Sequence, residues 1–227
     1  MLVLKLRFHL VYWLLLSAIF CSAQTPLEIE FIGNCGLHLS DGKTNIYVDF
    51  PYKSGAYGYM EYDSVRLDSI ENNSIFLFTH KHADHYSRKL LKQILKERNG
   101  KCFTQWKSKK LIKHFESNPD IGIEVFKTKH SFSLKHNSYL IKWHGKRIYL
   151  SGDTENAEKI ATIKEIDWAF LPPWILDDAK EKNLQIDSEM IGVYHLAPSE
   201  IESAIEEWGD KKNIVPLIKQ GEIIILR

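Results

Sequence analysis

Residues 79–85, Thr-His-Lys-His-Ala-Asp-His, bring together side chains that bind metal ions. They follow a short apolar stretch that is typical of a buried strand, and a helix-forming stretch comes next. His80 and His82 stand two residues apart, so in extended backbone both side chains leave the same side. Asp84 continues that spacing, and His85 lies where the chain turns toward the helix. Imidazole nitrogens with one carboxylate suit Zn²⁺ and also accept iron or manganese, so the segment predicts a metal site.

Crowding distinguishes this segment from histidines that stand alone in the sequence. A lone histidine usually lies at the surface or is hydrogen-bonded in the core, and we expect this of His9, His38, His114 and His144. Ionisable side chains rarely crowd together without a partner, because burying them costs free energy. We therefore interpret residues 79–85 as a set of ligands.

Apolar periodicity outlines the elements that must position these ligands. Expected strands are 27–32, 45–50, 74–78, 101–104, 123–127, 138–143, 147–150, 168–171, 214–218 and 222–226, and expected helices are 87–98, 108–116, 157–163 and 199–208. A turn-rich segment with Gly33, Gly36 and Gly42 is expected to join the first two strands. Strands, then strand–helix alternation, then strands again indicate a layered α/β architecture.

The composition is that of one ordinary globular domain. The chain has 227 residues, of which 44% are hydrophobic and 26% charged, with a formal net charge of +1. That length allows one substantial core and is short for two domains. No basic stripe or acidic tail is present, so we expect a small-molecule substrate and no nucleic-acid partner.

The first 23 residues differ in character from the rest of the chain. Two basic residues precede an apolar run, and small residues lead up to Ala23, as in a secretory signal peptide. We predict cleavage there, an exported (periplasmic or secreted) domain of residues 24–227, and no stable membrane insertion afterwards. Two alternatives stay open: an uncleaved membrane anchor, since the run approaches spanning length, and a lipid on Cys21.

Two cysteines would remain in the exported domain, Cys35 and Cys102. An oxidising compartment would permit a disulfide. Their spacing matches no known framework, so we favour two separate, largely buried thiols and leave pairing open.

Residues 79–85 resemble the H-x-H-x-D-H signature of the metallo-β-lactamase superfamily, and the resemblance extends along nearly the whole chain from residue 24. Phe-Ile-Gly at 31–33 leads to Tyr-Val-Asp at 47–49, as in the early strands of the family. The Gly-Asp pair within 149–154 and the histidine within 194–198 match later family motifs. This resemblance implies a four-layer αββα sandwich, in which two mixed β-sheets carry helices on their outer faces.

The resemblance also implies a complete site for two divalent metal ions, Zn²⁺ by default, with Mn²⁺ or Fe²⁺ as alternatives. The first ion would be held by His80, His82 and His130, and the second by Asp84, His85 and His195, with Asp153 bridging both. His136 stays open as an alternative to His130, which we prefer because it directly follows a predicted strand. Asp49 is expected to orient a metal-binding histidine through a hydrogen bond.

A site of this kind implies a hydrolase that uses a metal-bridging hydroxide to cleave an ester, lactone, amide or phosphodiester bond, with Asp84 as the catalytic residue. The compact chain is most similar to the small lactonase-like and phosphodiesterase-like members. Two alternatives share the fold: a catalytically degenerate metal-binding or scaffold protein, and an iron-containing redox member. His82 differs from the glutamate that is typical of the oxygen- or nitric oxide-reducing diiron branch.

Aromatic side chains are candidates for substrate contact. Tyr57 and Tyr59 stand in a glycine-bearing loop at 52–62, and Trp174 follows a predicted strand. We predict that all three line the pocket, and the alternative is that they cover the core.

Overall fold

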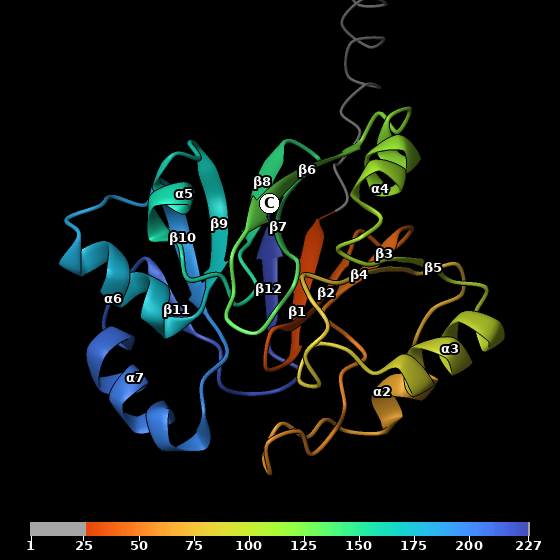
Figure 1. Cartoon of the computed structure of the whole chain (residues 1–227), viewed down its shortest axis with the longest axis horizontal. Coiled ribbons are helices and arrows are strands. Elements are labelled where there is room, and N and C mark those ends of the chain that lie inside the picture. The colour runs from red at the N-terminus through yellow and green to blue at the C-terminus, as the bar shows by residue number, and fades with distance from the viewer. Residues whose placement is uncertain (1–25, 227) are drawn as a thin grey trace, which may run out of the picture.

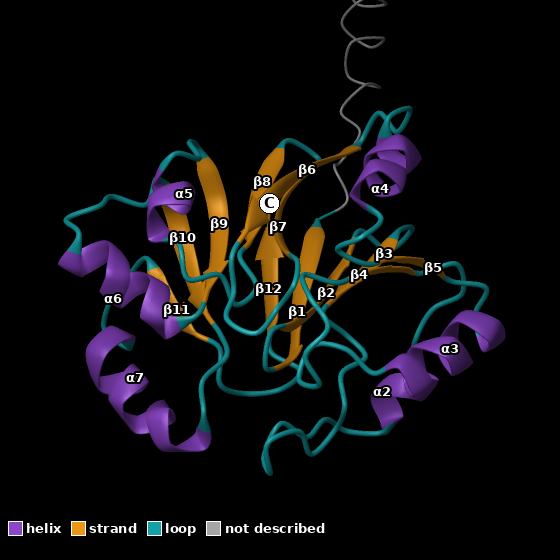
Figure 2. Cartoon of the chain, viewed as in Figure 1, coloured by secondary structure: helices purple, strands orange, loops and turns teal. Residues whose placement is uncertain are grey.

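Two six-stranded β-sheets pack face to face in the computed structural model, which describes residues 26–226 (Figure 1). The predicted signal peptide at residues 1–23 lies outside this range. Helices cover the outer faces of both sheets (Figure 2). The four-layer α/β sandwich expected for this chain is confirmed.

The first sheet has the strand order β12-β1-β2-β3-β4-β5. Its strands are β1 (Leu27–Gly33), β2 (Gly36–Ser40), β3 (Asn45–Val48), β4 (Ile75–Leu77), β5 (Lys101–Phe103) and β12 (Ile223–Leu226). The strands from β12 to β3 pair antiparallel, whereas β3, β4 and β5 run parallel. The sheet is mixed, and its parallel strands end at one common edge.

The second sheet has the strand order β11-β10-β9-β8-β7-β6. Its strands are β6 (Ile121–Thr128), β7 (His136–Trp143), β8 (Lys146–Leu150), β9 (Ile166–Leu171), β10 (Ser188–Val193) and β11 (Ile214–Pro216). β6, β7 and β8 pair antiparallel, and the strands from β8 to β11 run parallel. This sheet also brings the ends of several parallel strands to one edge.

Helices lie outside the two sheets. They are α2 (Val65–Asp68), α3 (Arg88–Glu97), α4 (Ser108–Phe115), α5 (Ala157–Ala161), α6 (Pro173–Glu181), the short 3₁₀ helix η2 (Pro198–Glu200) and α7 (Ile201–Trp208). α2 and α3 flank the first sheet, and α5, α6 and α7 flank the second (Figure 1). Within the described residues, no helix has the length and apolar character needed to cross a membrane.

Alternating side chains along the strands separate the layers of the core. In β7, Tyr139 and Ile141 are buried between the sheets together with Ile29 of β1. Leu140 points the other way and packs with Ile160 of α5. Burial of each such aliphatic side chain stabilises the fold by about 1.5–3 kcal/mol. Because side chains alternate between the two faces of a strand, this burial determines which strand residues face the space between the sheets.

Four elements of the structure were not predicted from the sequence. The segment expected to be turn-rich contains β2, in which Leu37 and Leu39 are fully buried but short polar and glycine residues on both sides conceal the alternation. α6 begins directly at Pro173. β10 was concealed because only its last three residues are buried and one of them is Gly192. The short helix α2 has no buried residue and so no apolar period.

Cys35 is buried, Cys102 is half-buried, and the two do not form a disulfide. The prediction of two separate thiols is confirmed.

Candidate metal centre

Loops that follow strands of both sheets carry the predicted ligands. The segment after β4 contributes residues 80–85, and single side chains come from the loops after β6, β8 and β10. These four side-chain sets meet although they lie far apart in sequence, because parallel strands of a sheet present their carboxyl ends at one edge. The structure therefore brings all seven predicted ligands together, and their role as ligands stays a prediction.

Asp49 fixes the position of the segment after β4. It is buried, and its carboxylate accepts hydrogen bonds from Thr79 N at 2.8 Å and from Thr79 Oγ1 at 2.7 Å. It also lies 3.0 Å from His85 Nδ1. Because Nδ1 donates to this carboxylate, Nε2 of His85 faces the other ligands, which is the orienting role expected of Asp49.

The first group of donors consists of His80, His82 and His130. One donor atom from each lies within 4.8 Å of the others. Nδ1 of His80 contacts Thr79 Oγ1 at 3.1 Å, so Nε2 is the nitrogen that remains available to bind a metal ion. Nε2 of His130 lies 3.2 Å from Nδ1 of His82. These three imidazoles match the ligand set predicted for the first ion.

The second group of donors is equally close. Asp84 Oδ2 lies 3.5 Å from His85 Nε2 and 3.3 Å from His195 Nε2. Asp153 Oδ2 lies 2.9 Å and 3.3 Å from the same two nitrogens. Ligands that share one ion at bonds of about 2.0–2.2 Å are separated by distances in this range.

Asp153 Oδ2 faces both groups at once. Besides its contacts with the second group, it lies 3.8 Å from Nε2 of His80 and 3.8 Å from Nε2 of His130. A single carboxylate oxygen in that position has the placement that a bridging ligand requires.

Buried polar atoms at the centre fit a bound cation. His80 Nε2 and Asp84 Oδ1 are inaccessible to solvent and have no hydrogen-bond partner among residues 26–226. Leaving a buried polar atom unpaired costs about 1–3 kcal/mol, and these atoms converge with other nitrogen and oxygen donors. The donor set therefore suits a divalent cation of the Zn²⁺, Fe²⁺ or Mn²⁺ type.

The electrostatics of the centre favour positive charge. Burial alone would raise the pKa of Asp84, but hydrogen bonds from His195 and His85 hold it well below its ordinary value. Burial alone would lower the pKa of His195, but Asp153 and Asp84 raise it to about 9. Burial and the neighbouring His85 lower the pKa of His80, so this imidazole is neutral and its nitrogen is available as a ligand.

His136 supports Asp153 and is engaged at both ring nitrogens. Its Nε2 accepts a hydrogen bond from Asp153 N at 3.1 Å, so Nδ1 carries the proton and donates to Thr128 Oγ1 at 2.7 Å. Burial lowers the pKa of His136 to about 3, in keeping with a neutral ring. The geometry thus favours His130 over His136 as the metal ligand.

Comparison with known proteins gives structural matches alone. No family model matches the sequence, and no curated protein is significantly similar to it. Among solved structures, a protein of Parabacteroides distasonis that has been assigned as a metal-dependent hydrolase is 22% identical, with a TM-score of 0.62 over 86% of this chain and 94% of that one. A metallo hydrolase from Ignicoccus hospitalis is 18% identical, with a TM-score of 0.61 over 89% of this chain and 99% of that one.

The metallo-β-lactamase fold protein YhfI from Bacillus subtilis is 12% identical, with a TM-score of 0.59 over 88% of this chain and 99% of that one. This chain has the metallo-β-lactamase fold. The two mixed sheets, and the loops that follow their strand ends at one edge, are arranged as in a metallo-β-lactamase-fold protein. The sequence motifs predicted this fold.

Two residues at the centre of this metallo-β-lactamase fold were not assigned a role there from the sequence. His136 was considered only as a rival ligand, and Cys35 only as a core thiol. Sγ of Cys35 lies 3.5 Å from Asp153 Oδ1. No sequence signal pointed to this contact, because it joins residues 118 positions apart.

The aromatic side chains predicted to contact substrate differ in placement. Trp174 donates from Nε1 to the Thr154 carbonyl at 2.9 Å, and its ring centre lies 5.1 Å from that of His195. It lines a cavity of about 360 Å³ together with His130. Tyr59 lines a neighbouring cavity of about 210 Å³, and Tyr57 is 69% exposed on its loop. Trp174 is the best placed of the three.

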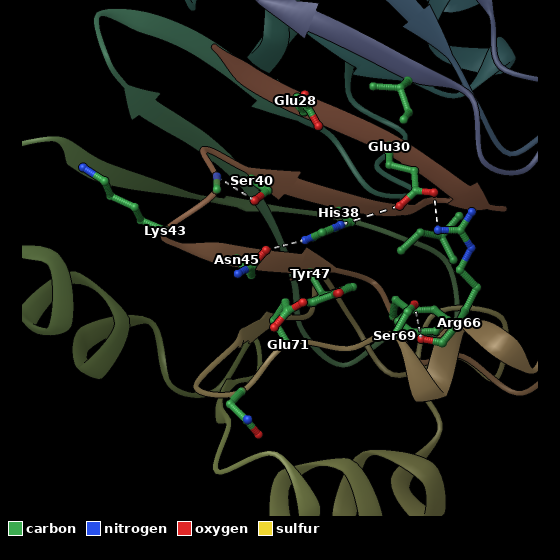
Figure 3. Close-up of a pocket in the computed structure, with 15 residues that line it drawn as sticks. Glu28, Glu30, His38, Ser40, Lys43, Asn45, Tyr47, Arg66, Ser69 and Glu71 are labelled. Atoms are coloured by element: carbon green, nitrogen blue, oxygen red, sulfur yellow. Dashed lines mark hydrogen bonds and ion pairs between the residues drawn. The ribbon is translucent and has the colours of Figure 1, made fainter. Parts of the chain in front are cut away.

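Another cavity, of about 530 Å³, lies elsewhere, on the outer face of the first sheet (Figure 3). Three of the ionisable side chains that line it contact one another: Glu30 forms ion pairs with Arg66 and, at 3.6 Å, with His38. His38 is also hydrogen-bonded to Asn45 at 2.9 Å. These contacts occupy the donor and acceptor atoms of Glu30, Arg66 and His38 with one another and with Asn45.

Proposed function

We propose that this chain is a metal-dependent hydrolase with a two-ion centre. The observation that carries the proposal is the position of Asp153 Oδ2, which faces the His80 and His130 nitrogens on one side and the His85 and His195 nitrogens on the other. A lone metal site would not need an anionic oxygen between two sets of imidazoles. Zn²⁺ is the proposed ion, because nitrogen donors predominate.

Two bound cations would supply hydroxide at neutral pH and would polarise the bond that is cleaved. The protein's own groups position the reaction. Asp84 faces the second group through Oδ2, and its Oδ1 is buried without a hydrogen-bond partner among the described residues. Oδ1 is therefore free to accept a hydrogen bond from the attacking water and to orient it, which is the catalytic role we assign to Asp84.

The proposed substrate is a small molecule with an ester, lactone, amide or phosphodiester bond. Trp174 is proposed to form a wall of the substrate pocket, because its ring stands beside His195 and lines the cavity next to His130. Tyr57 and Tyr59 are proposed to contact the substrate from the loop at 52–62. We further propose that the domain acts outside the cytoplasm, on the basis of the signal-like first 23 residues.

One structural match supports a second candidate function. CmlA from Streptomyces venezuelae, a diiron β-hydroxylase, is 13% identical, with a TM-score of 0.56 over 91% of this chain and 55% of that one. A similar fold can thus hold two iron ions and carry out redox chemistry. The nitrogen-rich donor set of this chain also accepts iron, so the identity of the metal separates the two functions.

The test combines metal analysis with a substrate screen on one preparation. Protein purified without added metal should contain two zinc ions per chain and should hydrolyse at least one generic ester, lactone, amide or phosphodiester. The variant His80→Ala should lose metal and turnover, whereas His144→Ala, which removes a histidine bound to Asp41 away from the centre, should keep both. Bound iron together with oxygen consumption would contradict the hydrolase and support the redox function. Full metal content without turnover on any substrate would support a protein that only binds metal.

A further inference from the structure

Cys35 is a buried thiol at the metal centre that the proposed function does not use. Its side chain is 1% exposed, and Sγ lies 3.5 Å from Asp153 Oδ1. Donor atoms of Cys35, His85, Asp153 and His195 all lie within 4.8 Å of one another. The Cys35 sulfur thus lies in the same compact group of donors as His85 and His195.

The turn between β1 and β2 holds Cys35 in this position. The neighbouring Asn34 donates from Nδ2 to the Asp84 carbonyl at 2.7 Å, and its own carbonyl accepts a hydrogen bond from His195 N at 3.0 Å. Gly33 has a φ of 116°, and a Cβ on Gly36 would lie 2.9 Å from the Gly33 carbonyl oxygen. The turn is therefore tied to the loops of two predicted ligands, and its tight backbone aims Cys35 at the space between them.

The carboxylate of Asp153 divides its two oxygens between different partners. Oδ2 faces the histidines of both groups, while Oδ1 faces Cys35. The sulfur atom therefore lies on the Oδ1 side of Asp153, within 4.8 Å of donor atoms of His85 and His195. Thiolate combined with imidazole and carboxylate is a ligand set that Zn²⁺ accepts.

We propose that Cys35 is a thiolate ligand of the ion bound by Asp84, His85 and His195. The inference rests on the two-ion centre of the proposed function and deepens it. On binding, the sulfur–metal bond forms and the thiol proton is released to solvent, so charge and atoms balance. A soft sulfur donor would favour zinc over manganese at this position.

Cobalt(II) reports directly on sulfur ligation, because a cobalt–thiolate bond adds a charge-transfer absorption band in the near ultraviolet that nitrogen and oxygen ligands do not produce. The full chain, loaded with cobalt alone, should show this band. Cys35→Ser should abolish the band, while Cys102→Ser and Cys21→Ser should retain it, as matched controls for the other two cysteines of the chain. X-ray absorption on the zinc-loaded wild type should show a sulfur neighbour at about 2.3 Å, and this measurement needs no variant to fold.

The outcomes separate this inference from the proposed function. Bound metal with turnover, but with no sulfur neighbour and no Cys35-dependent band, would overturn the inference and leave the hydrolase intact. Cys35 would then be only a hydrogen-bond donor to Asp153. A wild-type chain that binds no metal would overturn both.

Discussion

At the scale of single residues, Asp153 is held from three directions. Its backbone N–H donates to His136 Nε2, one carboxylate oxygen faces the histidines, and the other faces Cys35. The residue before it must be glycine, because a Cβ at Gly152 would lie 2.7 Å from both His136 Nε2 and Thr79 Cβ. The Gly-Asp pair noted in the sequence therefore has a steric cause.

Asp84→Ala should abolish turnover while the fold is kept. Among the described residues, the polar contacts of the side chain are with His85 and His195 at the centre and with Asn34, and the backbone carbonyl that accepts the bond from Asn34 remains in the variant. Removing a direct metal ligand should lower activity by more than the roughly 10–100-fold seen when a residue that hydrogen-bonds to a ligand is removed. Steady-state kinetics and circular dichroism on the same preparation check this, and unchanged activity would contradict the assigned role.

Asp49→Ala tests the support of His85. The change removes the acceptor for Thr79 N, Thr79 Oγ1 and His85 Nδ1, so metal affinity should fall about 10–100-fold. The unpaired buried Thr79 N–H should also lower the free energy of unfolding by about 1–3 kcal/mol. Competition with a chromophoric chelator measures the affinity, and Asp49→Asn, which keeps one acceptor oxygen, should be milder in both readouts.

At the scale of elements, a separate contact joins the turns of the two sheets at the edge opposite the candidate metal centre. Asp41, in the turn between β2 and β3, accepts hydrogen bonds from Lys43 N at 2.9 Å and Thr44 N at 2.8 Å. Its second oxygen lies 2.9 Å from Nε2 of His144, in the turn between β7 and β8. This one carboxylate closes its own turn and links the two sheets.

Asp41→Ala should lower the free energy of unfolding by about 1–3 kcal/mol at neutral pH. Burial alone would raise the pKa of Asp41, but bonds from Thr44, Lys43 and His144 lower it. The stabilisation is therefore complete above the ordinary carboxyl pKa of about 3.9 and is lost as pH falls through the lower value in the folded protein. Urea unfolding of both proteins from pH 3 to 6 should show the difference shrinking in acid, and a difference that grew there would contradict the assignment.

At the scale of the whole molecule, the candidate metal centre is built from loops of both sheets. The segment at 80–85 follows a strand of the first sheet, whereas His130, Asp153 and His195 follow strands of the second. A cation bound by both sets of ligands favours the folded chain, in which these loops are together.

Removal of metal with a chelator should therefore lower the melting temperature. A metal present at 100 times its dissociation constant stabilises the fold by about 2.7 kcal/mol. For a chain of this size that corresponds to a fall of roughly 5–11 °C on chelation. Differential scanning calorimetry with and without chelator checks this, His80→Ala should show a much smaller fall, and equal melting temperatures for the wild type would contradict a structural contribution of the metal.

Elements with a clear apolar period could be predicted from the sequence, and elements without one could not. The stripe in residues 87–98 predicted α3, and alternation in 138–150 predicted the hairpin of β7 and β8. β2 was not predicted because only two residues mark its apolar face, and β10 was not predicted because its final residues include Gly192. Short elements carry too few residues for a period to stand out from their flanks.

The sequence alone predicted residues 79–85 as a set of metal ligands, because spacing over seven residues fixes how neighbouring side chains are directed along the backbone. Tertiary structure alone decided which distant groups join it. It engaged both nitrogens of His136 and left His130 facing His82, and it placed Cys35 beside Asp153 across 118 positions. Such contacts depend on how two sheets pack and how strand ends align, and no local spacing encodes them.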